Sequence, residues 1–472
     1  MGDPTSHSDY TPEDFNTFAA RLAEETKILC EWFEKGVFSK KGKQVGAELE
    51  AWLVDPNYQP LPGNEELLQC LHNPFIVSEL SQFNLELNIT PEPIQGKTLM
   101  FIQEDLEQYW ANCNACASKQ NGKVIMIGIL PTVQENHLTL KHMSNRSRYV
   151  ALNNQVVAAR KGKPVMLDIQ GAEILKTSSD HVMLESAATS LQVHMEVSQE
   201  EAPRFYNACL IASAPIVAAG ANSPYLFGKD LWDETRIALF EQAIALGGEQ
   251  HDRVHFGSGY VKETLLECFL ENQKDYAIFL PELMERDPRA LAHLKLHNGT
   301  IWRWNRPLVG FDRNGQPHIR IEHRVLAAGP TILDVVANIA FFLGLTQMLA
   351  TQKSPPEQSL SFDTAKENFY RAAQKGIEAK IEWLDGKTYV IQGLILDQLI
   401  PLAKKGLRKL RIDKEDIAYY IDDIFANRIA KRKTGAIWQR RFIQTHGRNF
   451  HALMKFYGKN QDSGLAVHEW EI

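Results

Sequence analysis

The chain has 472 residues, of which 44% are hydrophobic and 23% are charged, the composition of a globular protein and not of a disordered chain. Its formal net charge of −7 and its lack of a long lysine or arginine block argue against nucleic acid or an anionic membrane surface as the main partner. Small molecules are the expected partners, and the sequence leaves open whether the chain forms a homo-oligomer.

Helical periodicity marks residues 11–35 and 99–119. Segments with strand-like alternation follow one another at 43–55, 84–90, 124–129, 190–198, 253–259 and 318–326. Strands and helices do not alternate regularly, and no GxxxxGK[ST] or GxGxxG motif follows a strand, so neither a P-loop fold nor a dinucleotide fold is favoured. We therefore predict an α+β fold built on an antiparallel sheet.

Two apolar stretches are predicted to be buried helices and not membrane spans. The stretch at 210–221 is too short to cross a bilayer and contains Pro215. The stretch at 331–349 carries Asp334 and Asn338, which a lipid-facing helix would not tolerate well.

A domain boundary is predicted at residues 352–361, where the sequence QKSPPEQSLS interrupts the periodic pattern. The chain beyond it is mostly helical in pattern and contains basic clusters such as AKKGLRKLR. We predict one domain over residues 1–350, with its first helix at about 11–35, and a helical C-terminal region over residues 351–472 packed on that domain.

The cysteines are too few to predict a disulfide framework. The chain has six of them and no signal peptide precedes them, so a reducing cytoplasm is the expected compartment. Cys113 and Cys116 form a lone CxxC within the helix predicted at 99–119. No second cysteine pair follows at zinc-site spacing, so these two side chains are expected to pack in the core.

The strand predicted at 43–55 contains the sequence GAELE, which places two glutamates on one face. Side chains two residues apart in a strand point the same way, so Glu48 and Glu50 share a face while Val45, Leu49 and Leu53 take the other. A solvated outer face would explain this strand alone, because surface glutamates are common.

Three further strands repeat the pattern of one apolar and one chemically reactive face. Their polar faces carry Glu86, Asn88 and Thr90; Gln192, His194 and Glu196; and Arg320, Glu322 and Arg324. Clustered carboxylates repel one another unless cations lie between them, and Mg²⁺ prefers carboxylate and phosphate oxygens. The pattern therefore favours a magnesium and nucleoside triphosphate site, in which arginines meet the phosphates, although a metal hydrolase would use the same spacing.

These residues lie in motifs that resemble those of the glutamate-cysteine ligases, most closely the second bacterial family of carboxylate-amine ligases, over about residues 40–345. The matching motifs are GxExE at 46–50, LELN at 85–88, LQVHMEVS with His194, IEHR with Glu322 and Arg324, RSRYVALN with Arg148 and Tyr149, and ANSPYLFGKDLWDETR ending at Arg236. Glu79 precedes Glu86 by the seven positions found in distant members. The chain departs from the family's HxH pattern at Gln192, and it has GILPT where close members carry a glycine-bounded histidine-proline stretch.

The resemblance implies a fold like the glutamine synthetase catalytic domain, a curved antiparallel sheet that forms a funnel around ATP and roughly two or three Mg²⁺ ions. The implied metal ligands are Glu48, Glu50, Glu79, Glu86, His194 and Glu322. Arg236 and Arg324 would act on the transferred phosphate, and Arg148 and Arg306 are weaker candidates for nucleotide contacts.

The implied activity is an ATP-dependent ligation of an amino-acid carboxylate, with glutamate favoured, to an amine such as cysteine, through an acyl phosphate, as in glutathione biosynthesis. Three alternatives stay open from the residues. They are a kinase on the same fold, a metal-dependent amidohydrolase, and a ligase-like protein that only binds ATP.

Overall fold

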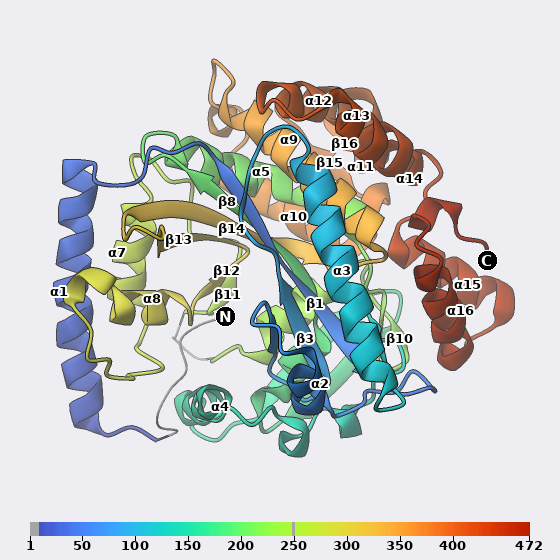
Figure 1. The fold of residues 1–472 in the computed structure, drawn as a ribbon, viewed down its shortest axis with the longest axis horizontal. Helices are drawn as coiled ribbons and strands as arrows, with labels where there is room; N and C mark the ends of the chain where they lie inside the picture. Colours follow the sequence, from blue (N-terminus) through green and yellow to red (C-terminus); the bar gives the residue numbers. More distant parts are fainter. Residues whose placement is uncertain (1–8, 248–250) are drawn as a thin grey trace.

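An eight-stranded antiparallel sheet forms a curved half-barrel at the centre of this computed structural model, which describes residues 9–247 and 251–472 (Figure 1). The strand order is β13-β14-β8-β1-β3-β2, and β4 and β5 both pair with β1. The strands are β1 (Gln44–Val54), β2 (Ile76–Ser78), β3 (Asn84–Asn88), β4 (Glu92–Pro93), β5 (Lys123–Ile125), β8 (Ser190–Val197), β13 (Asn305–Phe311) and β14 (Pro317–Ala327). The predicted α+β class is confirmed.

Small two-stranded sheets lie outside the main one. They pair β6 (Val165–Gln170) with β7 (Ile174–Ser179), β9 (Tyr225–Leu226) with β10 (Lys229–Asp230), β11 (Val254–His255) with β12 (Trp302–Arg303), and β15 (Lys380–Glu382) with β16 (Thr388–Val390). The strand expected over 253–259 is therefore only the short β11. Strand β13 was not expected because Pro307 interrupts its pattern, but β13 is an edge strand, where a missing N–H is tolerated.

The main helices surround this sheet, and the predicted helices at 11–35 and 99–119 are confirmed. They are α1 (Pro12–Lys35), α2 (Asn64–Leu71), α3 (Thr98–Ser118), α4 (Ser147–Ala159), α5 (Ala202–Gly220), α6 (Thr235–Ala243), α7 (Leu266–Asp275), α8 (Ala292–Asn298), α9 (Ile332–Ala350), α10 (Phe362–Lys375), α11 (Ile391–Leu394), α12 (Ile400–Lys409), α13 (Lys414–Ile417), α14 (Asn427–Ala430), α15 (Gly435–His446) and α16 (Phe450–Asp462).

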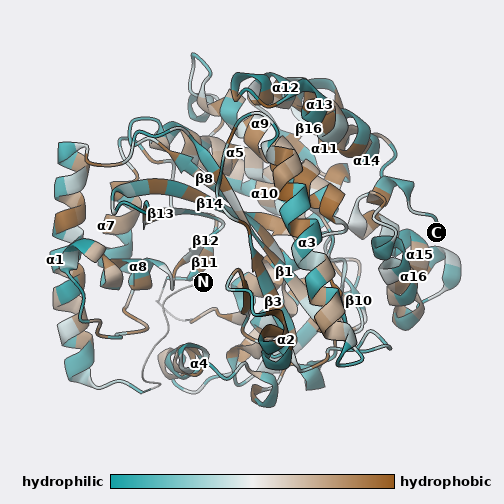
Figure 2. Ribbon diagram, viewed as in Figure 1, coloured by the Kyte–Doolittle hydropathy of each residue, from teal (hydrophilic) through white to brown (hydrophobic). Residues whose placement is uncertain are grey.

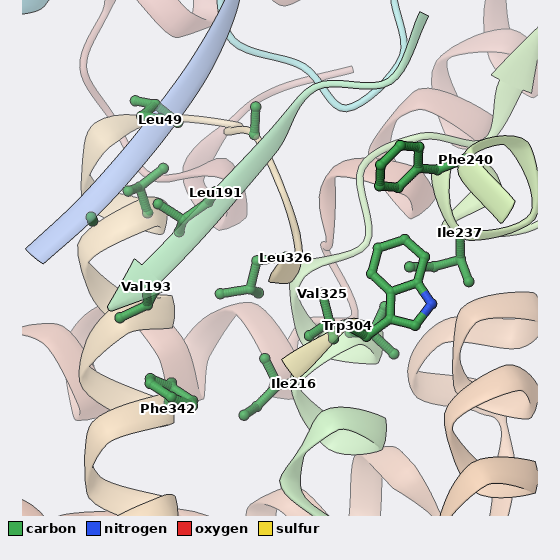
Figure 3. Close-up of a cluster of buried hydrophobic side chains, with 14 of the residues drawn as sticks. Leu49, Leu191, Val193, Ile216, Ile237, Phe240, Trp304, Val325, Leu326 and Phe342 are labelled. Atoms are coloured by element: carbon green, nitrogen blue, oxygen red, sulfur yellow. The ribbon is translucent and has the colours of Figure 1, made fainter. Parts of the chain in front are cut away.

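The apolar faces of the strands pack on α5 and α9. Leu49 and Val193 of the sheet gather with Ile216 of α5 and Phe342 of α9 in one buried cluster (Figure 3). Both helices are strongly hydrophobic, in contrast to the polar outer helices such as α12 (Figure 2). Burying one face of the sheet in this way leaves the opposite, charged face turned toward a cavity.

Helix α9 is buried, as the sequence predicts. It is apolar and long enough to cross a membrane, but 83% of its most apolar window is buried inside the structure. Its Asp334 is fully buried and pairs with Arg428 of α14 at 3.1 Å. A charged pair at its first turn and close packing along its length are properties of a core helix.

The C-terminal region packs on the core helices, with α12 against α9 and α10 against α5. Gly344 of α9 and Gly406 of α12 meet so closely that a Cβ atom on Gly406 would lie 1.9 Å from the carbonyl oxygen of Gly344. Only glycine permits this approach of two helix backbones. The placement of a domain boundary near residue 350 stays a prediction.

The expectation of no disulfide is wrong for one cysteine pair. Cys70 of α2 and Cys116 of α3 are joined by an S–S bond of 2.08 Å, with 5.9 Å between their Cα atoms. The two positions are 46 residues apart, and only the packing of α2 beside α3 brings them together. Cys113 is buried and free, as expected for core packing.

Candidate active site

The charged face of the sheet lines a cavity of about 520 Å³. Its acidic lining comes from Glu48, Glu50, Glu79, Glu86, Glu185 and Glu322, and its basic lining includes His194, Arg148, Arg306, Arg320 and Arg324. Residues of α6, α7 and α8 and of β12 contribute apolar surface, including Phe240, Phe269, Leu296 and Trp302. A concave site with convergent polar groups and an apolar wall is the usual form of a small-molecule site.

Strand register explains why the polar residues meet. His194 of β8 lies opposite Gly46 of β1 on one side and opposite Glu322 of β14 on the other. Glu50 of β1 lies opposite Glu86 of β3. Because cross-strand partners share a face of the sheet, four strands place their charged side chains together.

Glu48, His194 and Glu322 form a group whose geometry fits a divalent cation. Each of them offers one ligand atom, and these atoms all lie within 4.8 Å of one another. The Nε2 atom of His194 is 3.1 Å from Glu48 Oε1 and 3.9 Å from Glu322 Oε1. Both ring nitrogens of His194 are buried; Nε2 faces Glu48, and Nδ1 has no hydrogen-bond partner within the part of the chain that the structure describes. Two carboxylates and a buried imidazole form a donor set suited to Mg²⁺ or another divalent ion.

Two of the cavity carboxylates are held in the charged form. Burial alone would raise the pKa of Glu48, but His194 beside it lowers that pKa to about 2. Burial likewise opposes ionisation of Glu322, and the guanidinium groups of Arg306 and Arg324 hold its pKa well below the usual range.

Three of the other cavity carboxylates have raised pKa values. Burial, followed by the charge of Glu48, raises the pKa of Glu86 to about 7. Burial and the charge of Glu50 raise the pKa of Glu185 to about 8. Burial and the neighbouring glutamates place the pKa of Glu79 well above its usual range. A region in which carboxylates resist ionisation without a cation is one that a bound cation would stabilise.

The arginines at the sheet are tied to the carboxylates. Arg306 donates to both oxygens of Glu322, at 2.9 and 3.0 Å, and Arg324 donates to Glu322 Oε2 at 2.9 Å. Arg324 also donates to Gln192 Oε1 at 2.7 Å, and Gln192 donates in turn to Glu50 Oε1 at 3.0 Å. Gln192, which departs from the family's HxH pattern, therefore links Arg324 to Glu50.

Arg236 does not line the cavity, unlike the other residues that the sequence assigns to the site. Its guanidinium is buried, pairs with Glu234 at 3.0 Å and donates to the backbone carbonyl of Val325 at 2.5 Å. The resemblance implies that Arg236 contacts the transferred phosphate. In the structure its side chain points toward the backbone of β14. Arg148, one of the two weaker candidates for nucleotide contacts, lines the cavity from α4.

Glu185 lies in the cavity lining but was not predicted. It belongs to a short 3-10 helix, Val182–Ala187, just before β8. No alternation marks this segment, so only its position next to the strand that carries His194 could have suggested it. Tyr149 also lines the cavity, and its hydroxyl donates to the Ser78 carbonyl at 3.2 Å.

The half-barrel antiparallel sheet confirms the glutamine-synthetase-like fold that the sequence resemblance implies. The chain belongs to glutamate-cysteine ligase family 2, because the model of that family matches residues 44–449. No curated protein matches the chain significantly.

Two solved structures share the fold. One is the glutamate-cysteine ligase of Francisella tularensis in complex with AMP, with a TM-score of 0.53, 11% identity and coverage of 90% of each chain. The other is a bifunctional glutathione synthetase from Pasteurella multocida, with a TM-score of 0.51 and 10% identity; the match covers 93% of this chain and 55% of that one. At these identities the likeness is one of fold.

Proposed function

We propose that the protein is an ATP- and magnesium-dependent ligase that joins an amino-acid carboxylate to an amine. Glutamate is the first choice of carboxylate and cysteine is a representative amine. The observation that carries the proposal is the cluster of Glu48, His194 and Glu322 beside Arg306 and Arg324 within one cavity. Membership of the ligase family and the AMP bound to a protein of the same fold support it.

The chemistry follows from what the cavity supplies. A carboxylate is a poor electrophile, so it has to be activated as an acyl phosphate before an amine can displace phosphate. Bound Mg²⁺ would neutralise phosphate and carboxylate oxygens while that charge shifts. Glu48, Glu322 and His194 would hold the metal, and Arg306 and Arg324 would supply fixed positive charge. The apolar wall would keep water from the reactive intermediate.

Removing magnesium is expected to weaken ATP binding strongly. The buried carboxylates repel the triphosphate, and only a cation between them makes the contact favourable. Calorimetric titration of ATP into the protein, with excess magnesium in one series and with chelator in the other, measures this difference. Equal affinity in the two series would remove the metal cluster from the proposal.

Hydroxylamine trapping tests the acyl phosphate. With ATP, magnesium and a carboxylate, hydroxylamine in place of the amine is expected to yield a hydroxamate in step with ADP. Arg324→Ala should abolish both signals together, since it removes a fixed charge beside Glu322. A panel of amino acids as the carboxylate, with glutamate first, would identify the preferred substrate.

The same assay separates the rival activities. A kinase would accumulate a stable phosphorylated product without any amine, and an amidohydrolase would cleave amides without nucleotide. A protein that only binds ATP would release neither ADP nor hydroxamate. ADP formed without hydroxamate across the panel would rule out the ligase and leave the kinase.

We also propose a cytoplasmic location and a role in glutathione biosynthesis. The cytoplasm supplies ATP and amino acids, and in this location the Cys70–Cys116 bond has to withstand reducing conditions. Redox titration of this disulfide against glutathione, followed by the mass of the alkylated protein, would show whether the bond persists at a cytoplasmic potential.

A further inference from the structure

The sheet contains a bulge at Arg324. Strands β14 and β8 pair in register up to His323, opposite Val193, and resume at Leu326, opposite Leu191. Two residues of β14 therefore face the single residue 192 of β8, which defines a β-bulge. A bulge removes backbone groups from the ladder and redirects a side chain, and here the redirected side chain is the arginine that meets the carboxylate cluster.

The backbone carbonyls of this bulge accept hydrogen bonds from Arg236. Its guanidinium donates to the Val325 oxygen at 2.5 Å and to the Arg324 oxygen at 3.4 and 3.5 Å. Only 2% of the surface of Arg236 is exposed, and its guanidinium lies over the ring of Trp304, 5.5 Å from the ring centroid. The backbone carbonyl of Trp304 also accepts a hydrogen bond from the backbone amide of Arg324, at 2.9 Å. The guanidinium therefore donates to the Glu234 carboxylate and to the backbone of residues 324 and 325.

Glu234 fixes the position of Arg236. One carboxylate oxygen of Glu234 accepts from Arg236 Nε at 3.0 Å, and the other accepts the backbone amide of Asn222 at 2.9 Å. Glu234 is fully buried, so the pair neutralises two charges that would each be costly alone. Asn222 is held from the C-terminal helices by Gln439 of α15 and Tyr457 of α16, each at 2.9 Å.

We propose that Arg236 is a positioning residue that sets the orientation of Arg324 in the cavity by holding the bulge at residues 324 and 325. Glu234 holds Arg236 in turn. The inference rests on the proposed function, in which Arg324 meets phosphate oxygens. Arg236 then acts on the site through the backbone of β14, and not by direct contact with phosphate.

Hydrogen exchange tests the bulge without any ligand. The double variant Arg236→Met with Glu234→Gln removes both charges and keeps similar volumes. Backbone amides of residues 323–327 are expected to exchange faster in this variant, because the carbonyl oxygens of the bulge lose the hydrogen bonds that Arg236 donates and the bulge opens more often. The amides of β1 and β3 are expected to keep their protection. Lys404→Met with Asp422→Asn, an ion pair of the C-terminal region, is the matched control. Unchanged protection at 323–327 would overturn the proposal.

A double-mutant cycle then tests the link to Arg324. The Arg236→Met, Glu234→Gln protein is expected to bind magnesium ATP about tenfold more weakly than the parent. In an Arg324→Ala background the same change should add less than about twofold, since its effect passes through Arg324. An equal loss in both backgrounds would mean that Arg236 touches the nucleotide itself, and parental affinity in the folded variant would mean a purely structural role.

Arg236→Lys keeps the positive charge and some donor capacity, so its affinity should fall between the parent and the double variant. It also replaces the double variant in both measurements if that protein does not fold. If the parent protein binds no magnesium ATP, the proposed function fails, and the exchange measurement still decides whether Arg236 holds the bulge.

Discussion

Changing Glu48 to Gln is expected to lower the turnover of the ligase reaction by at least about two orders of magnitude with little change in melting temperature. The Glu48 carboxylate is charged, with its pKa lowered to about 2, and it lies 3.1 Å from His194 in the cavity. Glutamine keeps the shape and removes the charge that would hold a cation. The apolar face of β1 is untouched, because Ala47 and Leu49 pack on the other side. Steady-state ADP release and calorimetric melting measure the two quantities.

Glu24→Gln is the control for this change, because Glu24 is exposed on α1 and does not line the cavity. It should leave both turnover and melting temperature at parental values. Glu50→Gln and Glu86→Gln should behave like Glu48→Gln, since both side chains line the same cavity. A large fall in melting temperature combined with normal turnover per folded molecule would show that these carboxylates serve the fold and not the reaction.

Changing Arg428 to Met is expected to lower the free energy of unfolding by about 3–5 kcal/mol. Arg428 and Asp334 are both fully buried and lie 3.1 Å apart, so losing the arginine leaves a buried carboxylate without its counter-charge. Asp334 also accepts the Thr331 hydroxyl at 2.7 Å and the Val467 amide at 2.9 Å. These bonds lessen the cost of the buried charge but do not neutralise it. Urea denaturation followed by circular dichroism measures the change.

Arg432→Met is the matched control, because Arg432 pairs with Glu378 at the surface, where an ion pair contributes little. Adding Asp334→Asn to Arg428→Met should restore part of the lost stability, since no uncompensated charge remains. If Arg428→Met lowered the free energy of unfolding no more than Arg432→Met does, water would have to reach Asp334. The buried ion pair would then not hold the C-terminal helices to α9.

The sheet and most of the cavity lining could be predicted because strand alternation is a local property. Glu48, Glu86, His194 and Glu322 follow the period of two in the sequence, and the structure places all four in the cavity lining. The same alternation identified the buried faces that pack on α5 and α9. A pattern that repeats within a few residues fixes the face that a side chain takes, whatever the rest of the fold does.

Features that depend on distant parts of the chain could not be predicted in this way. Arg236 lies on a helix that follows a family motif, but only the bulge in β14 decides what its guanidinium contacts. Glu185 reaches the cavity from a segment without periodicity. The Cys70–Cys116 bond requires α2 and α3 to pack side by side, and cysteine spacing alone contains no information on that packing.

The close contact of α9 with α12 bears on the order in which the chain is made. During synthesis α9 leaves the ribosome before α12 exists, so the surface around Gly344 is uncovered for that interval. In the interval the nascent chain presents a helix with a mean hydropathy of 1.8, which resembles a membrane segment in length and composition. Only the arrival of Gly406 and its neighbours closes this surface, so translation has to reach the C-terminal helices before the core of the protein is complete.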